Sequence, residues 1–135
     1  MPWKRNAVVA FLVAFAIWPA VHRVLVATWD VNPWKLAGWA MYARPHFPGR
    51  LVLRLNEGGQ ERLLRELSPR EQALAADFVE RRYSAGRLAS PDALAEALLA
   101  RHPRADFVVV ELRTPVFDLA SATLKRRIER IRVAR

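Results

Sequence analysis

The first apolar segment of the chain runs from Ala7 to Trp29 and is apolar on every side. From Ala7 to Val21 it carries no charge, so it lacks the polar face that a helix of a soluble protein turns to water. As a helix it would be about 34 Å long, and the hydrocarbon core of a bilayer is about 30 Å thick. The pattern therefore predicts a membrane-spanning helix within residues 1–29.

Three residues interrupt this segment. Pro19 removes one helical hydrogen bond, which membrane helices tolerate. His22 and Arg23 add polarity, but Arg23 lies near Trp29 and the expected interface, where its guanidinium reaches towards headgroups. The alternative is an arginine paired with an acidic group on a partner helix.

The same segment also fits the apolar region of a secretory signal peptide. A small-x-small cleavage pattern is missing around Ala20 and Ala27, which favours an uncleaved anchor. Lys4 and Arg5 precede the segment and predict a cytoplasmic N-terminus, with the C-terminal part in the periplasm or outside the cell.

In residues 50–135, apolar residues recur at every second position in some segments, as in a strand, and with a period of 3.6 in others, as in a helix. Residues 50–56 place three leucines on one face, which predicts a strand with one buried side. Glu57-Gly58-Gly59 predicts a hairpin turn, after which residues 60–67 return as a second strand with Leu63 and Leu67 buried.

Two helices are expected after this hairpin. Ser68-Pro69-Arg70-Glu71 predicts a capped helix start, and the apolar stripe continues to about Gly86. Ser90-Pro91-Asp92 opens a second, shorter helix that ends before Pro103.

The C-terminal third predicts further strand. Residues 106–113 are β-branched and fit a central strand. The last stretch fits a helix through Leu124, Ile128 and Ile131, or an edge strand through Ile131 and Val133. A strand is favoured, because it completes a compact layer of sheet and helices. The expected fold class is a membrane-anchored α+β protein, with an anchor (1–29), an aromatic connector (30–49) and a small sheet-and-helix domain (50–135).

The connector is rich in aromatic side chains. Tryptophan and tyrosine beside cations, directly after a span, suit the headgroup layer. The alternative is that these rings cap the small domain, and both can hold at once. The candidate interface is Trp34, Trp39, Met41, Tyr42 and Phe47.

Trp39-Ala-Met-Tyr-Ala-Arg-Pro45 resembles the W-x-M-[FY]-[AS]-x-x-P element of certain bacterial membrane proteins, where the element follows a membrane helix and precedes a small β-containing domain. Some of these are similar to the horizontally transferred transmembrane proteins related to vitamin K-dependent carboxylase, and others are short single-span companions. The resemblance covers this element alone. It implies a location in a bacterial cytoplasmic membrane and partnership with a membrane protein, and it transfers no catalytic residue.

The formal net charge is +9, from 22 basic and 13 acidic residues. A basic domain beside a bilayer is drawn to anionic headgroups, although GC-rich codons alone also raise the arginine content. The densest basic stretch lies at the C-terminus, and no aromatic residues are interleaved there to stack nucleic-acid bases, so nucleic acid is disfavoured. The candidate basic patch is Lys125, Arg126, Arg127, Arg130 and Arg132.

No motif for catalysis, cofactor binding or metal binding is expected. Cysteine is absent, and His22, His46 and His102 lie far apart in sequence without the spacing of metal ligands. Glu57 and Glu61 flank the predicted turn and are the nearest approach to a carboxylate pair, but they are expected to be solvated. The preferred hypothesis is a non-enzymatic, single-pass protein that binds or positions a membrane protein. The alternatives are an accessory subunit of a membrane enzyme, carboxylase-like or redox, and a domain that binds anionic lipid or nucleic acid.

Overall fold

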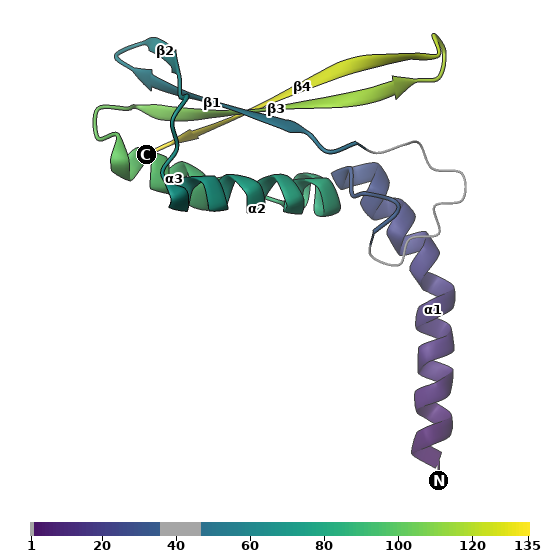
Figure 1. The fold of residues 1–135 in the computed structure, drawn as a ribbon. Coiled ribbons are helices and arrows are strands. Elements are labelled where there is room, and N and C mark those ends of the chain that lie inside the picture. The colour runs from purple at the N-terminus through teal and green to yellow at the C-terminus, as the bar shows by residue number, and fades with distance from the viewer. Residues whose placement is uncertain (1, 36–46) are drawn as a thin grey trace.

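A computed structural model describes residues 2–35 and 47–135 and confirms the α+β class (Figure 1). One long N-terminal helix precedes a sheet of four strands with two helices on one side. In chain order the elements are α1 (Pro2–Trp29), β1 (Arg50–Glu57), β2 (Gln60–Leu63), α2 (Pro69–Ala85), the short 3-10 helix η1 (Gly86–Leu88), α3 (Asp92–Arg101), β3 (Phe107–Asp118) and β4 (Thr123–Ala134).

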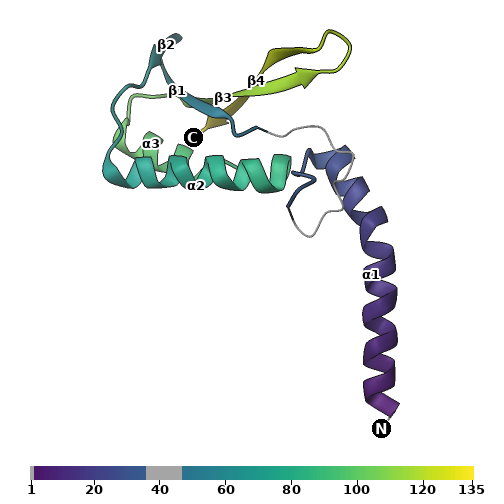
Figure 2. The same ribbon diagram turned by 45° about the vertical axis from the view of Figure 1, so that its right-hand side comes forward.

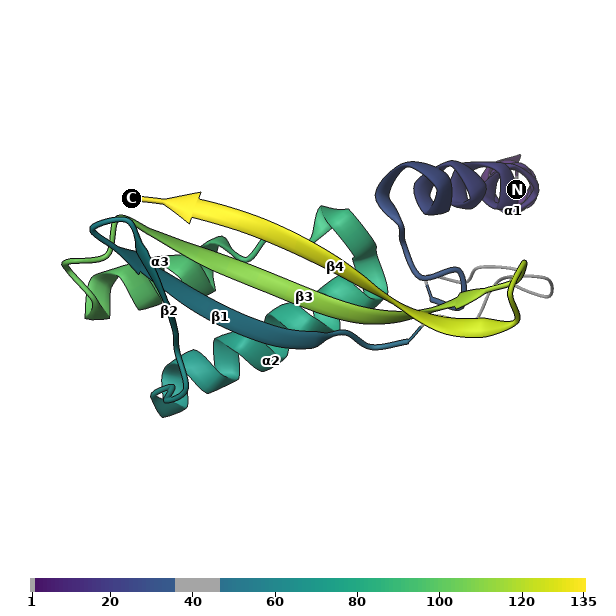
Figure 3. The same cartoon turned by 90° about the horizontal axis from the view of Figure 1, so that it is seen from above.

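The sheet is antiparallel throughout, with the strand order β2-β1-β3-β4. Helices α2 and α3 lie against one face, and the opposite face carries no helix of the described residues (Figures 2 and 3). The core fills the space between the helices and the covered face. Its most deeply buried side chains are Leu55, Phe78, Leu94, Leu98, Val108 and Val110.

The C-terminal stretch is the strand that its alternating pattern favoured. Ile131 pairs with Val110 and Val133 pairs with Val108, so both reach the covered face and pack against the core. β1 pairs with β3 only as far as Arg113, whereas the β3–β4 ladder continues to its last pair, Asp118 with Thr123. The outer half of this hairpin is therefore a two-stranded arm that extends beyond the sheet (Figure 3).

The prediction for the second strand was wrong at its C-terminal end. β2 stops at Leu63 instead of continuing to residue 67, and the Leu63 side chain is 48% exposed. Leu63 lies opposite Arg54, which places it on the helix-free face, while Leu64 and Leu67 pack partly against the core. Leu64 and Leu67 are three residues apart and would point to opposite faces of one continuous strand, so both can reach the core only because the chain leaves the sheet after Leu63.

The start of α2 follows the predicted capping box. The Glu71 amide donates to the Ser68 hydroxyl at 3.3 Å, and the Ser68 amide donates to the Glu71 carboxylate at 2.7 Å. Glu71 is buried, and Arg101 from α3 donates to it at 2.5 Å, so the cap also ties the two helices together. Burial alone would raise the pKa of Glu71, but the hydrogen bonds from Ser68 and Arg101 outweigh it and lower that pKa.

Ser68→Ala is expected to lower the free energy of unfolding by about 1 kcal/mol, because the Glu71 amide loses its partner at the start of the helix. Chemical denaturation of the full chain in detergent, followed by circular dichroism, measures this. Ser90→Ala is the matched control. Ser90 also precedes a proline at the start of a helix, but α3 has no side-chain cap, so a change within about 0.5 kcal/mol is expected. Equal losses for the two variants would contradict the prediction.

Helix α1 is exposed and apolar along most of its length. Val8, Phe11, Leu12 and Ile17 are each more than half exposed, and the segment Trp3–Trp29 is long and apolar enough to cross a membrane. An uncleaved anchor and a signal sequence both meet this criterion of length and composition. Pro19 lies inside the helix without ending it.

The C-terminal end of α1 is built into the small domain. Val31 and Asn32 are buried, and the Asn32 amide donates to the carbonyl oxygen of Ser84 in α2 at 3.1 Å. Gly86 lies so close that a Cβ there would be 2.2 Å from the carbonyl oxygen of Trp29. Among the described residues, the end of α1 and the two residues before Asn32 are thus held directly against α2 and η1.

Candidate interaction surface on the helix-free sheet face

Strand register assigns a cluster of arginines to the helix-free face of the sheet. Every second residue of each strand points to this face, and six of these positions are arginines against two glutamates. We call this surface the cationic sheet face. It comprises Arg50, Val52, Arg54, Glu61, Leu63, Val109, Glu111, Arg113, Pro115, Arg126, Ile128, Arg130 and Arg132.

Glu111 lies at the centre of the cationic sheet face, in β3, and its side chain is fully buried beneath arginines. The Nε of Arg113 donates to one carboxylate oxygen at 2.6 Å, and the Nε of Arg130 donates to the other at 2.9 Å. A terminal nitrogen of Arg54 lies 4.0 Å from the same group. Three strands thus each contribute one cation to a single carboxylate.

This arrangement keeps Glu111 ionised. The hydrogen bond from Arg113 lowers its pKa most strongly, burial opposes this, and the bond and charge of Arg130 add to the lowering. One negative charge cannot neutralise three guanidinium groups, so the surface keeps an excess of positive charge. The Arg130 side chain remains 61% exposed and the Arg54 and Arg113 side chains about one third exposed, which leaves them accessible to an incoming acidic group.

The remaining cations of the face are held less tightly. Arg132 stacks over the Phe107 ring, with its guanidinium carbon 3.6 Å from the ring centroid. Arg54 also lies 3.7 Å from Glu61, an exposed ion pair that contributes little to stability.

Glu57 and Glu61 do not form a carboxylate pair. They lie opposite Gln60 and Asn56, at successive positions of the β1–β2 ladder, so their side chains point to opposite faces of the sheet.

The structure divides the candidate basic patch between the two sides of β4. Arg126, Arg130 and Arg132 belong to the cationic sheet face. Lys125 and Arg127 point to the covered side, where Lys125 pairs with Asp118 and Arg127 pairs with Asp30 at the end of α1. The hydrogen bond from Lys125 is the main cause of the lowered pKa of Asp118. Three of the five predicted cations thus make ion pairs, because Arg130 pairs with Glu111 on the cationic sheet face.

The aromatic candidates lie at or beside the junction. Trp34 is 58% exposed, and its amide donates to the Asn32 side chain at 3.0 Å. Phe47 is half-buried just before β1. Trp39, Met41 and Tyr42, and with them the segment that resembles the W-x-M-[FY] element, fall outside the described residues.

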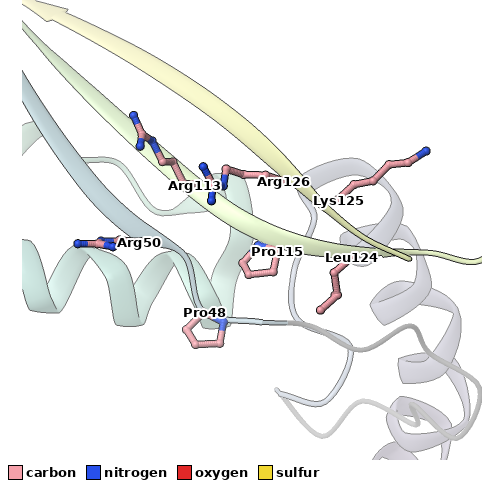
Figure 4. A pocket seen from close by; sticks show the side chains of 7 residues that line it. All are labelled: Pro48, Arg50, Arg113, Pro115, Leu124, Lys125 and Arg126. Carbon is pink, nitrogen blue, oxygen red and sulfur yellow. The ribbon is translucent and has the colours of Figure 1, made fainter. Parts of the chain in front are cut away.

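A pocket of about 490 Å³ opens where β1 begins and the β3–β4 arm leaves the sheet (Figure 4). Of the described residues that line it, four carry a cationic side chain and none an acidic one. The lining residues are Pro48, Arg50, Arg113, Pro115, Leu124, Lys125 and Arg126.

Glu111, Arg54 and Arg113 were missed by sequence reasoning, whereas Arg130 belongs to the predicted basic patch. The available signal was Glu111, the one charged residue among 107–112, where a strand buried on both faces would be apolar throughout. Within the described residues, no group of three histidine or acidic side chains is placed to hold a metal ion.

Comparison of the chain with protein-family models, curated proteins and solved structures found no match.

Proposed function

We propose that this chain is a single-pass membrane protein whose small domain docks an acidic extramembrane region of a partner membrane protein on the cationic sheet face. The observation that carries the proposal is the excess of arginines around Glu111 on a sheet face that no helix of the described residues covers. The function is binding and positioning, without a reaction.

The direction of α1 supports a protein partner over a lipid surface. In Figure 1, α1 leads away from the sheet on the side where α2 and α3 lie. A bilayer crossed by α1 would therefore lie on the helix side, and the cationic sheet face would point away from it. Headgroups of that bilayer would be poorly placed to reach the arginines around Glu111 at the centre of the face, whereas the extramembrane part of a neighbouring protein would reach them.

Charge selects the chemistry of the partner. The arginines that share Glu111 are close enough together to donate to further carboxylates. Bidentate contacts with aspartate or glutamate are the strongest that guanidinium groups make with proteins. Val52 and Ile128 lie between the arginines and add apolar contact area. The surface thus suits an acidic segment with interspersed apolar residues, and mutations of its exposed cations should act mainly on association.

Photo-crosslinking in native membranes tests this proposal. A photoreactive residue in place of Ile128, which is 51% exposed on the cationic sheet face, should give one discrete adduct with a membrane protein. Peptide mapping should locate the crosslink in an acidic segment. The adducted chain should stay in the membrane through alkaline washing and retain residues 1–29.

Two controls make the result specific. The photoreactive residue in place of Ala73, exposed on α2, should give no such adduct. Arg132→Glu should reduce the Ile128 adduct at least about tenfold, because it reverses a charge at the contact, while Arg62→Glu on the other side of the hairpin should not. Loss of residues 1–29, equal adducts from both positions, or adducts with lipid alone would refute the proposal.

A further inference from the structure

We infer that the pocket between the start of β1 and the β3–β4 arm binds a phosphate group, as inorganic phosphate or as a phosphate ester. The pocket lies at one end of the cationic sheet face, where β1 begins, and its test changes neither Ile128 nor Arg132. Its ligand groups are Arg50, Arg113 and Arg126, which come from three adjacent strands.

The three arginines line the pocket from one face of the sheet. Arg50 lies opposite Arg113 in the β1–β3 ladder, and Arg126 lies opposite Pro115, two residues further along β3. All three therefore belong to the same face. In Figure 4 the guanidinium groups of Arg113 and Arg126 lie near each other, whereas the ammonium of Lys125 points away, towards its pair with Asp118.

Most of this positive charge is not neutralised. Among the described residues, Arg50 and Arg126 have no hydrogen bond or ion pair, and Arg113 uses only its Nε for Glu111, so its two terminal nitrogens remain available. Like charges held together in a recess repel one another, which an anion in the pocket would relieve. The binding of an anion here should therefore be favourable.

The geometry favours phosphate over a single carboxylate. A carboxylate has two oxygens and one charge, and Glu111 already accepts one Nε donor from each of two arginines on its two oxygens. A phosphate group presents more oxygens and up to two charges, so it can accept donors from several arginines at once. Pro48, Pro115 and Leu124 form the apolar part of the wall, where the organic part of an ester would rest.

Comparing the affinities of a lipid and of a soluble phosphate distinguishes the two possible sources of the phosphate group. Arg127 of the arm pairs with Asp30, directly after α1, so the arm lies close to the level at which α1 would leave a bilayer. A short-chain phosphatidic acid and inorganic phosphate carry the same anionic group. Tighter binding of the lipid would assign a headgroup as the source, and tighter binding of inorganic phosphate would assign a soluble one.

The experiment is calorimetric titration of the full chain in sugar-detergent micelles, which contain no phosphate. Inorganic phosphate should bind saturably, and Arg50→Ala with Arg126→Ala should weaken this binding at least about tenfold. The control pair, Arg62→Ala with Arg104→Ala, removes the same charge from exposed positions elsewhere and should change it less than about twofold.

A conservative pair protects the test against misfolding. Arg50→Lys with Arg126→Lys keeps both charges but removes the guanidinium forks, so an intermediate loss of affinity is expected with unchanged circular dichroism. Absence of saturable binding, equal losses in the two alanine pairs, or full affinity in the lysine pair would each overturn the inference.

Discussion

Glu111→Gln is expected to lower the free energy of unfolding by about 2 kcal/mol, although the substitution preserves the size of the side chain. The variant removes the negative charge on which Arg113, Arg130 and Arg54 converge. Breaking a fully buried ion pair costs about 3 to 5 kcal/mol. We expect less here, because the guanidinium groups reach solvent and their mutual repulsion is partly screened. Denaturation of the full chain in detergent measures the difference.

The pH dependence of this loss identifies its cause. The pKa of Glu111 lies below its ordinary value of 4.5, so its ion pairs stabilise the folded state at neutral pH. That stabilisation is fully present above 4.5 and is lost as the pH falls through the lowered pKa of the folded state. The difference between wild type and Glu111→Gln should therefore shrink below this range. Glu61→Gln, an exposed partner of Arg54, should change stability by less than about 0.5 kcal/mol. A loss independent of pH would point to packing instead.

Gly86→Ala is expected to have an effect of similar or larger size, about 3 kcal/mol, centred on the junction between α1 and the domain. Gly86 has φ +56° with ψ −134°, a conformation that residues with a Cβ rarely adopt. An added Cβ would also lie 2.2 Å from the carbonyl oxygen of Trp29 and 2.3 Å from that of Asp30. Backbone atoms cannot move aside as a side-chain tip can, so the end of α1 must separate from η1.

Hydrogen exchange locates this effect. The Asn32 amide, bonded to Ser84 across the junction, should exchange faster in Gly86→Ala, while the amides of β3 keep most of their protection. Gly58→Ala is the matched control. Gly58 has a nearly identical φ of +58°, but a Cβ there would meet nothing within 4 Å, so only the conformational cost remains. If the two variants lose equal stability and leave the Asn32 amide unchanged, close packing at the junction is not important.

The elements that local sequence determines were predicted correctly. Ser68 and Glu71 specify the start of α2 within four residues, and Ile131 and Val133 alternate because their neighbours in β3 face the same core. The end of β2 could not be located in this way. Leu63, Leu64 and Leu67 are equally apolar, and only pairing with Arg54 decides which of them faces solvent.

The cationic sheet face could not be derived from composition. Glu111 and Arg130 are 19 residues apart, and Arg54 comes from a third strand, so their meeting depends on the register of two separate ladders. The same limit applies to Gly86, whose neighbour Trp29 lies in another part of the chain. Sequence indicated a basic C-terminal stretch, and strand alternation then assigned its cations to two different faces.

The close junction at Gly86 also makes the orientation of the domain depend on the rotation of its helix. Each residue of an α-helix turns the chain by about 100° and advances it by about 1.5 Å. A single residue inserted into α1 would therefore swing the cationic sheet face around the helix axis by more than a quarter turn while barely raising it. If a neighbouring helix always contacts the same side of α1, it also determines the direction, around the axis of α1, in which the arginines of the cationic sheet face point.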